Sequence, residues 1–123
     1  MNRRTRKKWM KKHGTYVNPR ECWNLDYTIA RFALPRLKVY KKDCNCYPGK
    51  GDADTPEKWD EILNKMIMAF EYVLEDDYWW RNDPRYKMIY FKDENFVTEV
   101  KRRQLVIKDG LELFAKYLQD LWW

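Results

Sequence analysis

The sequence predicts an all-α protein, a small bundle of three main helices with a basic N-terminal arm. Three observations lead to this prediction. Apolar side chains recur at steps of three and four residues in three separate segments, helix-capping residues stand where helices would begin, and the connections are short. The chain has 123 residues, 45% of them hydrophobic, which is enough to bury one core. We therefore expect an arm over residues 1–20 and a single helical domain over residues 21–123.

The first predicted helix begins near residue 24, where Asn24 or Asp26 can serve as its cap. Pro35 then removes a backbone donor, so the helix either ends near Ala33 or kinks and resumes as far as Tyr40. The kink is favoured because the apolar stripe continues past the proline. The side chains expected to face inward are Leu25, Ile29, Phe32, Ala33, Leu37 and Tyr40.

The second helix, predicted over about residues 55–76, follows a loop over residues 43–54 and has the clearest start. The Thr55 hydroxyl can cap the first turn, and Pro56 suits the first position because its missing donor would be unpaired anyway. Glu57 complements the helix dipole. The expected apolar stripe consists of Trp59, Ile62, Leu63, Met66, Ile67, Phe70, Val73 and Leu74.

The third helix is predicted over about residues 94–121. Gly110 lies inside it, and because a mid-helix glycine costs about 1 kcal/mol relative to alanine, it marks either a close helix crossing or a break. The preceding residues 77–92 read as a short strand, a helical turn or an irregular segment. The expected stripe of the third helix consists of Phe96, Val100, Ile107, Leu111, Phe114, Leu118 and Leu121.

Positive charge is concentrated in residues 1–20, which hold eight of the 25 basic residues and none of the 19 acidic ones. Residues 21–123 hold 17 basic and 19 acidic residues, so the net charge of +6 belongs to the arm. A concentrated cationic segment attracts polyanions through counterion release and long-range steering. The candidate anion-binding residues of the arm are Arg3, Arg4, Arg6, Lys7, Lys8, Trp9, Lys11 and Lys12.

Two further groups of cations could extend this surface. Arg31, Lys38 and Lys42 are spaced by seven and four residues, which places them on one side of the first helix if Pro35 does not break it. A second group lies in the third helix. Both groups also fit the solvated face of an ordinary amphipathic helix, so that alternative stays open. The cations of the second group are Lys101, Arg102 and Arg103.

These patterns favour a non-enzymatic protein that binds an anionic partner, either nucleic acid or a nucleotide signal. The chain has no serine, a single histidine and no glycine-rich phosphate loop, which excludes catalytic triads and most histidine-based general acid and base schemes. The alternative is an interaction or assembly protein, with other proteins or further copies of the chain as partners. Its contacts would be the tryptophans outside the predicted stripes, Trp79, Trp80, Trp122 and Trp123.

No cofactor or metal is expected. His13, Cys22, Cys44 and Cys46 make four candidate zinc ligands, but zinc pairs usually hold roughly two to four residues between cysteines, and one residue separates Cys44 from Cys46. Reduced thiols are expected instead. No apolar run reaches the roughly 20 residues that cross a bilayer, and no signal peptide follows the basic start. We therefore expect a soluble cytoplasmic protein.

Several stretches resemble a group of small uncharacterised proteins encoded by tailed bacteriophages and prophages, and the resemblance extends over about half of the chain. They are residues 22–32 (CWNLDYTIARF), 34–38 (LPRLK), 59–63 (WDEIL), 65–67 (KMI) and 69–71 (AFE). The resemblance implies a phage accessory protein made in the cytoplasm of a bacterial host, with no catalytic residues to carry over. By analogy it also suggests binding to host factors, nucleic acid or the nucleotide signals of antiviral defence. For the alternative function it implies an inhibitor of a host factor or defence system, or a component of the virion.

Overall fold

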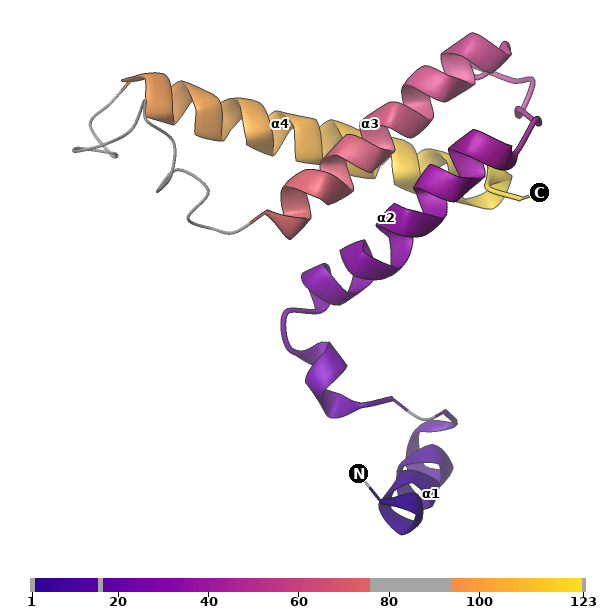
Figure 1. Cartoon of the computed structure of the whole chain (residues 1–123), viewed down its shortest axis with the longest axis vertical. Helices are drawn as coiled ribbons and strands as arrows, with labels where there is room; N and C mark the ends of the chain where they lie inside the picture. Colours follow the sequence, from indigo (N-terminus) through magenta and orange to yellow (C-terminus); the bar gives the residue numbers. More distant parts are fainter. Residues whose placement is uncertain (1, 16, 76–93, 123) are drawn as a thin grey trace.

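The computed structural model describes residues 2–15, 17–75 and 94–122, and over these residues the protein is all-α, as predicted (Figure 1). Helix α3 packs against both α2 and α4, whereas α2 and α4 do not pack directly on each other. Helix α1 lies apart from this bundle. The helices are α1 (Arg3–His13), α2 (Leu25–Asp43), α3 (Pro56–Leu74) and α4 (Glu94–Tyr117), with short 3-10 helices η1 (Pro19–Cys22) and η4 (Leu118–Asp120).

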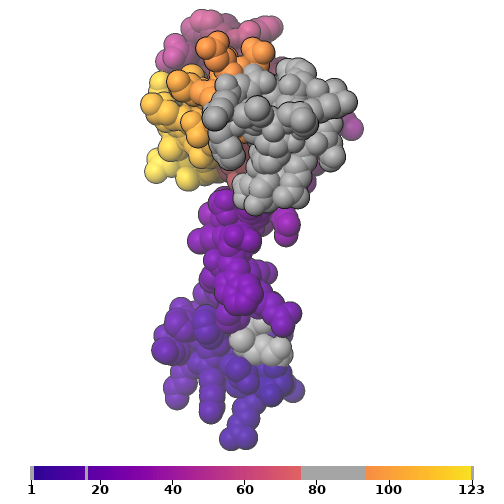
Figure 2. Space-filling model, turned by 90° about the vertical axis from the view of Figure 1, so that its left-hand side faces the viewer, coloured from indigo at the N-terminus to yellow at the C-terminus, as the bar shows by residue number. Residues whose placement is uncertain are grey.

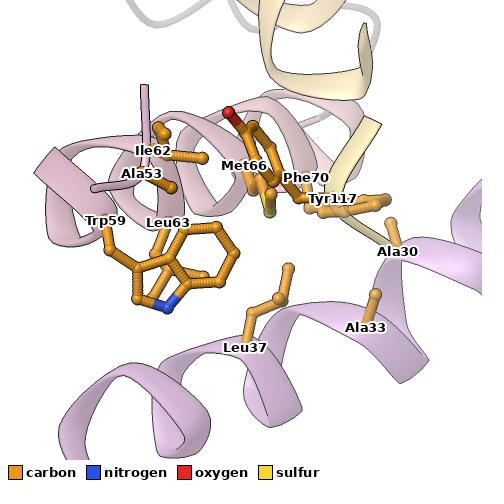
Figure 3. Close-up of a cluster of buried hydrophobic side chains, with 10 residues drawn as sticks. All are labelled: Ala30, Ala33, Leu37, Ala53, Trp59, Ile62, Leu63, Met66, Phe70 and Tyr117. Atoms are coloured by element: carbon orange, nitrogen blue, oxygen red, sulfur yellow. The ribbon is translucent and has the colours of Figure 1, made fainter. Parts of the chain in front are cut away.

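The central helix α3 begins as the sequence predicts. The Thr55 hydroxyl accepts a hydrogen bond from the backbone N–H of Lys58 at 3.2 Å, and Pro56 occupies the first turn. Its apolar stripe supplies half of the ten buried side chains of the core cluster, and side chains from α2 and α4 also point into this cluster (Figure 3). The buried residues of α3 are Trp59, Ile62, Leu63, Met66, Ala69 and Phe70.

Helix α4 is continuous through Gly110, which lies at its crossing with α3. A Cβ atom at this position would approach the Ala69 Cβ to 2.3 Å and the carbonyl oxygen of Lys65 to 2.4 Å. Only glycine leaves room for the two backbones to come this close. Of the two alternatives for Gly110, the close crossing is therefore confirmed. Phe96, near the start of the same helix, is buried as predicted.

Helix α2 continues through Pro35 to Asp43, so it does not end near Ala33. Asn24, one of the two predicted cap residues, is its N-cap, but it has a φ of 49° and its side chain makes no capping hydrogen bond. The helix meets α3 along Ala30, Ala33 and Leu37, which are buried.

The inward face predicted for the start of α2 is wrong in part. Leu25, Ile29 and Phe32 are 51%, 50% and 62% exposed. The helix carries two adjacent apolar stripes, and α3 covers the one that contains Ala30 and Ala33. Because α4 does not close over the other stripe, these large side chains stay in contact with solvent.

The stripe predicted for α4 is also buried only in part. Leu111 and Leu118 are 38% and 53% exposed, whereas Phe96 is buried. Tyr117, which was not part of the predicted stripe, is buried as well. Helix α4 packs against α3 alone among the long helices, so only one side of its stripe is covered. The residues predicted as an irregular segment or strand, 77–92, lie outside the described residues.

Candidate nucleic-acid interface

Most of the basic arm forms a regular helix, α1, which the sequence analysis did not predict. The Asn2 side chain caps its first turn by accepting a hydrogen bond from the N–H of Thr5 at 2.9 Å. Gly14 ends it with a φ of 75° and donates its N–H to the carbonyl of Met10 at 2.8 Å. Asn2 and Gly14 are the local sequence signals from which this helix could have been predicted.

No side chain of α1 is buried, and α1 packs against no other helix of the described chain. Figure 2 shows it at one end of the molecule, joined to the bundle by a narrow middle region. The aromatic ring of Trp9 is the half-buried exception on its surface, with its centroid 4.2 Å from that of His13. The predicted cations Arg3, Arg4, Arg6, Lys7, Lys8, Lys11 and Lys12 are all exposed.

The charges of α1 are largely uncompensated. Apart from Arg6, none of its arginines and lysines forms an ion pair or side-chain hydrogen bond within the described chain. The helix itself contains no acidic residue. Solvated cations without a carboxylate partner keep their full attraction for a polyanion.

The chain between α1 and α2 is shaped by short local hydrogen bonds. The Asn18 side chain accepts a hydrogen bond from the N–H of Arg20 at 3.1 Å, which starts η1. The Thr28 hydroxyl then donates to the carbonyl of Glu21 at 2.9 Å and holds η1 beside the first turns of α2. Between them lies an open depression of about 420 Å³, lined in part by Arg20, Trp23 and Arg31. Of these three residues, only Arg31 was among the predicted anion-binding residues.

The unbroken α2 brings the predicted cations Arg31, Lys38 and Lys42 onto one side of the helix. All three are exposed. The ammonium group of Lys38 lies 3.1 Å from the carboxylate of Glu71 on α3, so part of its charge is balanced within the bundle. This side of α2 therefore adds a weaker positive surface than α1.

Two of the three predicted cations on α4 are engaged with acids. The Arg102 guanidinium binds both carboxylate oxygens of Glu99, at 2.9 and 2.7 Å, and donates to the Tyr72 hydroxyl at 3.0 Å. These hydrogen bonds raise the pKa of Arg102 above its usual range. Arg103 pairs with Glu99 and with Glu75 at the end of α3. The arginines thus join α3 to α4, while Lys101 is exposed.

The tryptophans predicted to make protein contacts are only partly placed. Trp79, Trp80 and Trp123 lie outside the described residues. Trp122 is 66% exposed, and its carbonyl accepts a hydrogen bond from the Tyr40 hydroxyl at 3.1 Å. The pKa of Tyr40 is raised to about 12, mainly by burial and to a smaller extent by a hydrogen bond to Cys44.

An apolar groove of about 320 Å³ lies between α2 and the C-terminal end of α4. It exists because both helices pack on α3 and not on each other. Arg36 is the only charged residue in its wall, and its guanidinium carbon lies 3.8 Å from the centroid of the Phe32 ring. The groove is lined by Ile29, Phe32, Ala33, Arg36, Leu37, Tyr40, Phe114, Leu118 and Leu121.

The candidate zinc ligands do not form a cluster. Among the described residues, no three histidine, cysteine, aspartate or glutamate side chains are arranged to hold a metal ion. A hydrogen bond to Cys44 raises the pKa of Cys46, which disfavours the thiolate that zinc requires. His13 lies at the end of α1 and Cys22 in η1, both exposed.

Comparison with known proteins gave no match to a family model, a curated protein or a solved structure. In the part of the chain that the structure describes, every helix is too short or too polar to cross a bilayer.

Proposed function

We propose that this protein binds nucleic acid through α1, as a non-enzymatic accessory protein of phage type in the bacterial cytoplasm. One observation carries the proposal. An 11-residue helix holds seven arginines and lysines, has no acidic residue and buries no side chain against the rest of the protein. The helix contributes nothing to the core, so its composition is explained by contact with an external polyanion.

The spacing of the cations supports the same conclusion. Like charges recur four residues apart along α1, as in Arg4–Lys8 and Lys7–Lys11, and each such pair destabilises an isolated helix by roughly 0.2–0.5 kcal/mol. Phosphates placed along the helix would remove this repulsion. Nucleic acid should therefore increase the helix content of α1 when it binds, a change that circular dichroism can measure.

The proposal is tested by the salt dependence of binding to a short DNA duplex, measured by fluorescence anisotropy. A contact of roughly six phosphates predicts a loss of affinity of about 1,000-fold between about 50 and 200 mM salt. Deleting residues 2–13 should abolish that salt-dependent binding.

A matched control separates α1 from total charge. Replacing Lys7, Lys8 and Lys11 by glutamine should weaken binding strongly and reduce its salt dependence, because glutamine keeps the helix propensity but not the charge. The same replacement at three lysines of the bundle, Lys65, Lys108 and Lys116, should have little effect. Equal losses from the two triple variants would contradict the proposal.

A second candidate function, protein binding, is favoured by the apolar groove between α2 and α4. Phe32 and Leu118 at this groove are 62% and 53% exposed, an unusual state for two large apolar side chains that border one depression. Arg36 in the wall and the cations on the neighbouring side of α2 favour a partner with negative charge. The occupant that fits is an amphipathic helix of another protein, with an apolar face and acidic flanks.

This candidate is tested with two designed helical peptides that share leucines at helical spacing and differ only in glutamate or lysine flanks. The glutamate peptide should bind, and Phe32→Asp should abolish its binding. Removal of residues 2–13 should leave binding of the glutamate peptide to the unsubstituted groove unchanged. Equal binding of both peptides would contradict the charge argument, and concentration-dependent dimerisation in sedimentation would assign the groove to a second copy of the chain.

A further inference from the structure

The depression where η1 meets α2 is lined by two arginines and an exposed tryptophan. Its volume, about 420 Å³, falls within the range of small-ligand pockets. Its wall comes from η1 and the start of α2, and η1 follows α1 in the chain and lies between α1 and the bundle (Figure 1). Its wall includes Arg20, Glu21, Trp23, Tyr27, Thr28 and Arg31.

Two arginines of this depression have no partner within the described chain. The guanidinium groups of Arg20 and Arg31 form neither an ion pair nor a hydrogen bond there, in contrast to Arg102 and Arg103 on α4. Glu21 is the one acidic residue in the wall, so the site keeps an excess of positive charge. Arginine pairs of this kind bind phosphate through bidentate hydrogen bonds.

Trp23 supplies an aromatic surface beside these charges. Its side chain is 78% exposed, more than any other large hydrophobic residue among those described. Exposing so much of the indole to water is unfavourable. Trp23 lies before the first turn of α2, and its side chain is not part of the buried core. Aromatic side chains in this setting stack on nucleobases, and each stacked base increases the affinity by roughly 5- to 150-fold.

The backbone at Asn24 supports a ligand role for the same site. Asn24 is the only residue other than glycine with a positive φ in the described chain, at 49°, and its side chain makes no capping hydrogen bond. A positive φ is uncommon outside glycine, although asparagine adopts it more readily than most residues, and residues in this region cluster at functional sites. The Asn24 carboxamide has one acceptor and two donor hydrogens for the edge of a base.

We infer that this depression holds one nucleotide of a single-stranded nucleic acid, with the base stacked on Trp23 and its phosphate between Arg20 and Arg31. The inference rests on the proposed function and names the form of nucleic acid. A base inside a duplex is already stacked between its neighbours and cannot reach an indole on the protein surface, whereas an unpaired base can.

The test compares three probes by fluorescence anisotropy or calorimetry: an oligothymidylate of roughly ten nucleotides, a short duplex, and thymidine monophosphate. Trp23→Ala should weaken binding of the oligothymidylate about tenfold or more, because one stacked base is lost, and leave duplex binding unchanged. Trp23→Phe should restore most of the affinity. The double variant Arg20→Gln, Arg31→Gln should weaken the single strand more than the duplex.

Matched controls are Tyr47→Ala, which removes an aromatic ring that is 44% exposed elsewhere, and Lys65→Gln, which removes one bundle charge. Neither should change binding of the single strand, and thermal unfolding should show that every variant is folded. Unchanged affinity of Trp23→Ala for the oligothymidylate would overturn the inference, and so would equal losses for strand and duplex. Monophosphate binding as tight as the strand would assign the site to free nucleotides instead.

These outcomes separate the inference from the function on which it rests. If Trp23→Ala has no effect while deletion of residues 2–13 abolishes duplex binding, the inference fails and the role of α1 stands. If the deletion leaves duplex binding intact, the role of α1 fails, and the Trp23-dependent loss for the single strand still reports on the depression.

Discussion

Helix α1 and helix α3 are both regular helices, but they form for different physical reasons. In α3, six side chains are buried between two neighbouring helices, and packing supplies most of the stability. In α1 no side chain is buried, and the helix depends on its two caps, while its charges repel one another. Isolated helices shorter than about 12–15 residues are marginal in water, so α1 is the element whose stability a ligand can change.

The largest test of this contrast removes an aromatic side chain from each region. Phe70 is 3% exposed, and its ring centroid lies 5.1 Å from that of Phe114 in an edge-to-face contact. Phe70→Ala should lower the free energy of unfolding by about 3–5 kcal/mol in urea titrations. Trp9→Ala in α1 should leave the free energy of unfolding unchanged. A comparable loss from both variants would show that α1 packs on the bundle.

A methyl group added at a glycine should also act differently in the two regions. At Gly110 it meets Ala69 and the backbone of Lys65, so Gly110→Ala should destabilise the bundle by about 1–3 kcal/mol despite the better helix propensity of alanine. Gly14→Ala strains the left-handed end of α1 and should lower its helicity alone. Stabilisation by Gly110→Ala would contradict the close crossing. Circular dichroism and thermal unfolding measure both effects.

Removal of a helix cap should have a smaller effect of the same kind. Thr55→Ala takes away the cap of α3 and should lower the free energy of unfolding by about 1 kcal/mol, whereas Thr55→Ser should retain it. Asn2→Ala removes the corresponding cap of α1 and should reduce helix content without shifting the unfolding midpoint. A shift of the midpoint by Asn2→Ala would mean that the two regions unfold together.

The smallest expected effect on stability comes from the largest change in sequence. Deleting residues 2–13 should alter the free energy of unfolding by less than about 0.5 kcal/mol, because no contact with the bundle is lost. The same deletion is expected to abolish duplex binding. Calorimetric unfolding of the shortened protein checks the first statement, and a clear drop in its unfolding temperature would contradict it.

Local signals accounted for the parts of the fold that were predicted well. Thr55 and Pro56 define the start of α3, and the single stripe from Trp59 to Phe70 has one interpretation. The signals at Asn2 and Gly14 were equally local, but the density of positive charge suggested an arm outside the fold, so α1 was missed. The candidate site was also predicted only in part. The cations of α1 follow from composition, whereas the lack of a partner for Arg20 and the exposure of Trp23 depend on which residues surround them.

The sequence by itself determined the helical class, the span of α3 and the concentration of positive charge in α1, because capping, apolar spacing and net charge are properties of neighbouring residues. The tertiary structure alone decided which stripe of α2 is buried, that Gly110 is a crossing point, and that Arg103 is paired with Glu75. Burial and pairing depend on which distant segment covers a side chain. Helical spacing does not say which of the two adjacent apolar stripes on α2 is buried. The packing of α3 against one of them decides it.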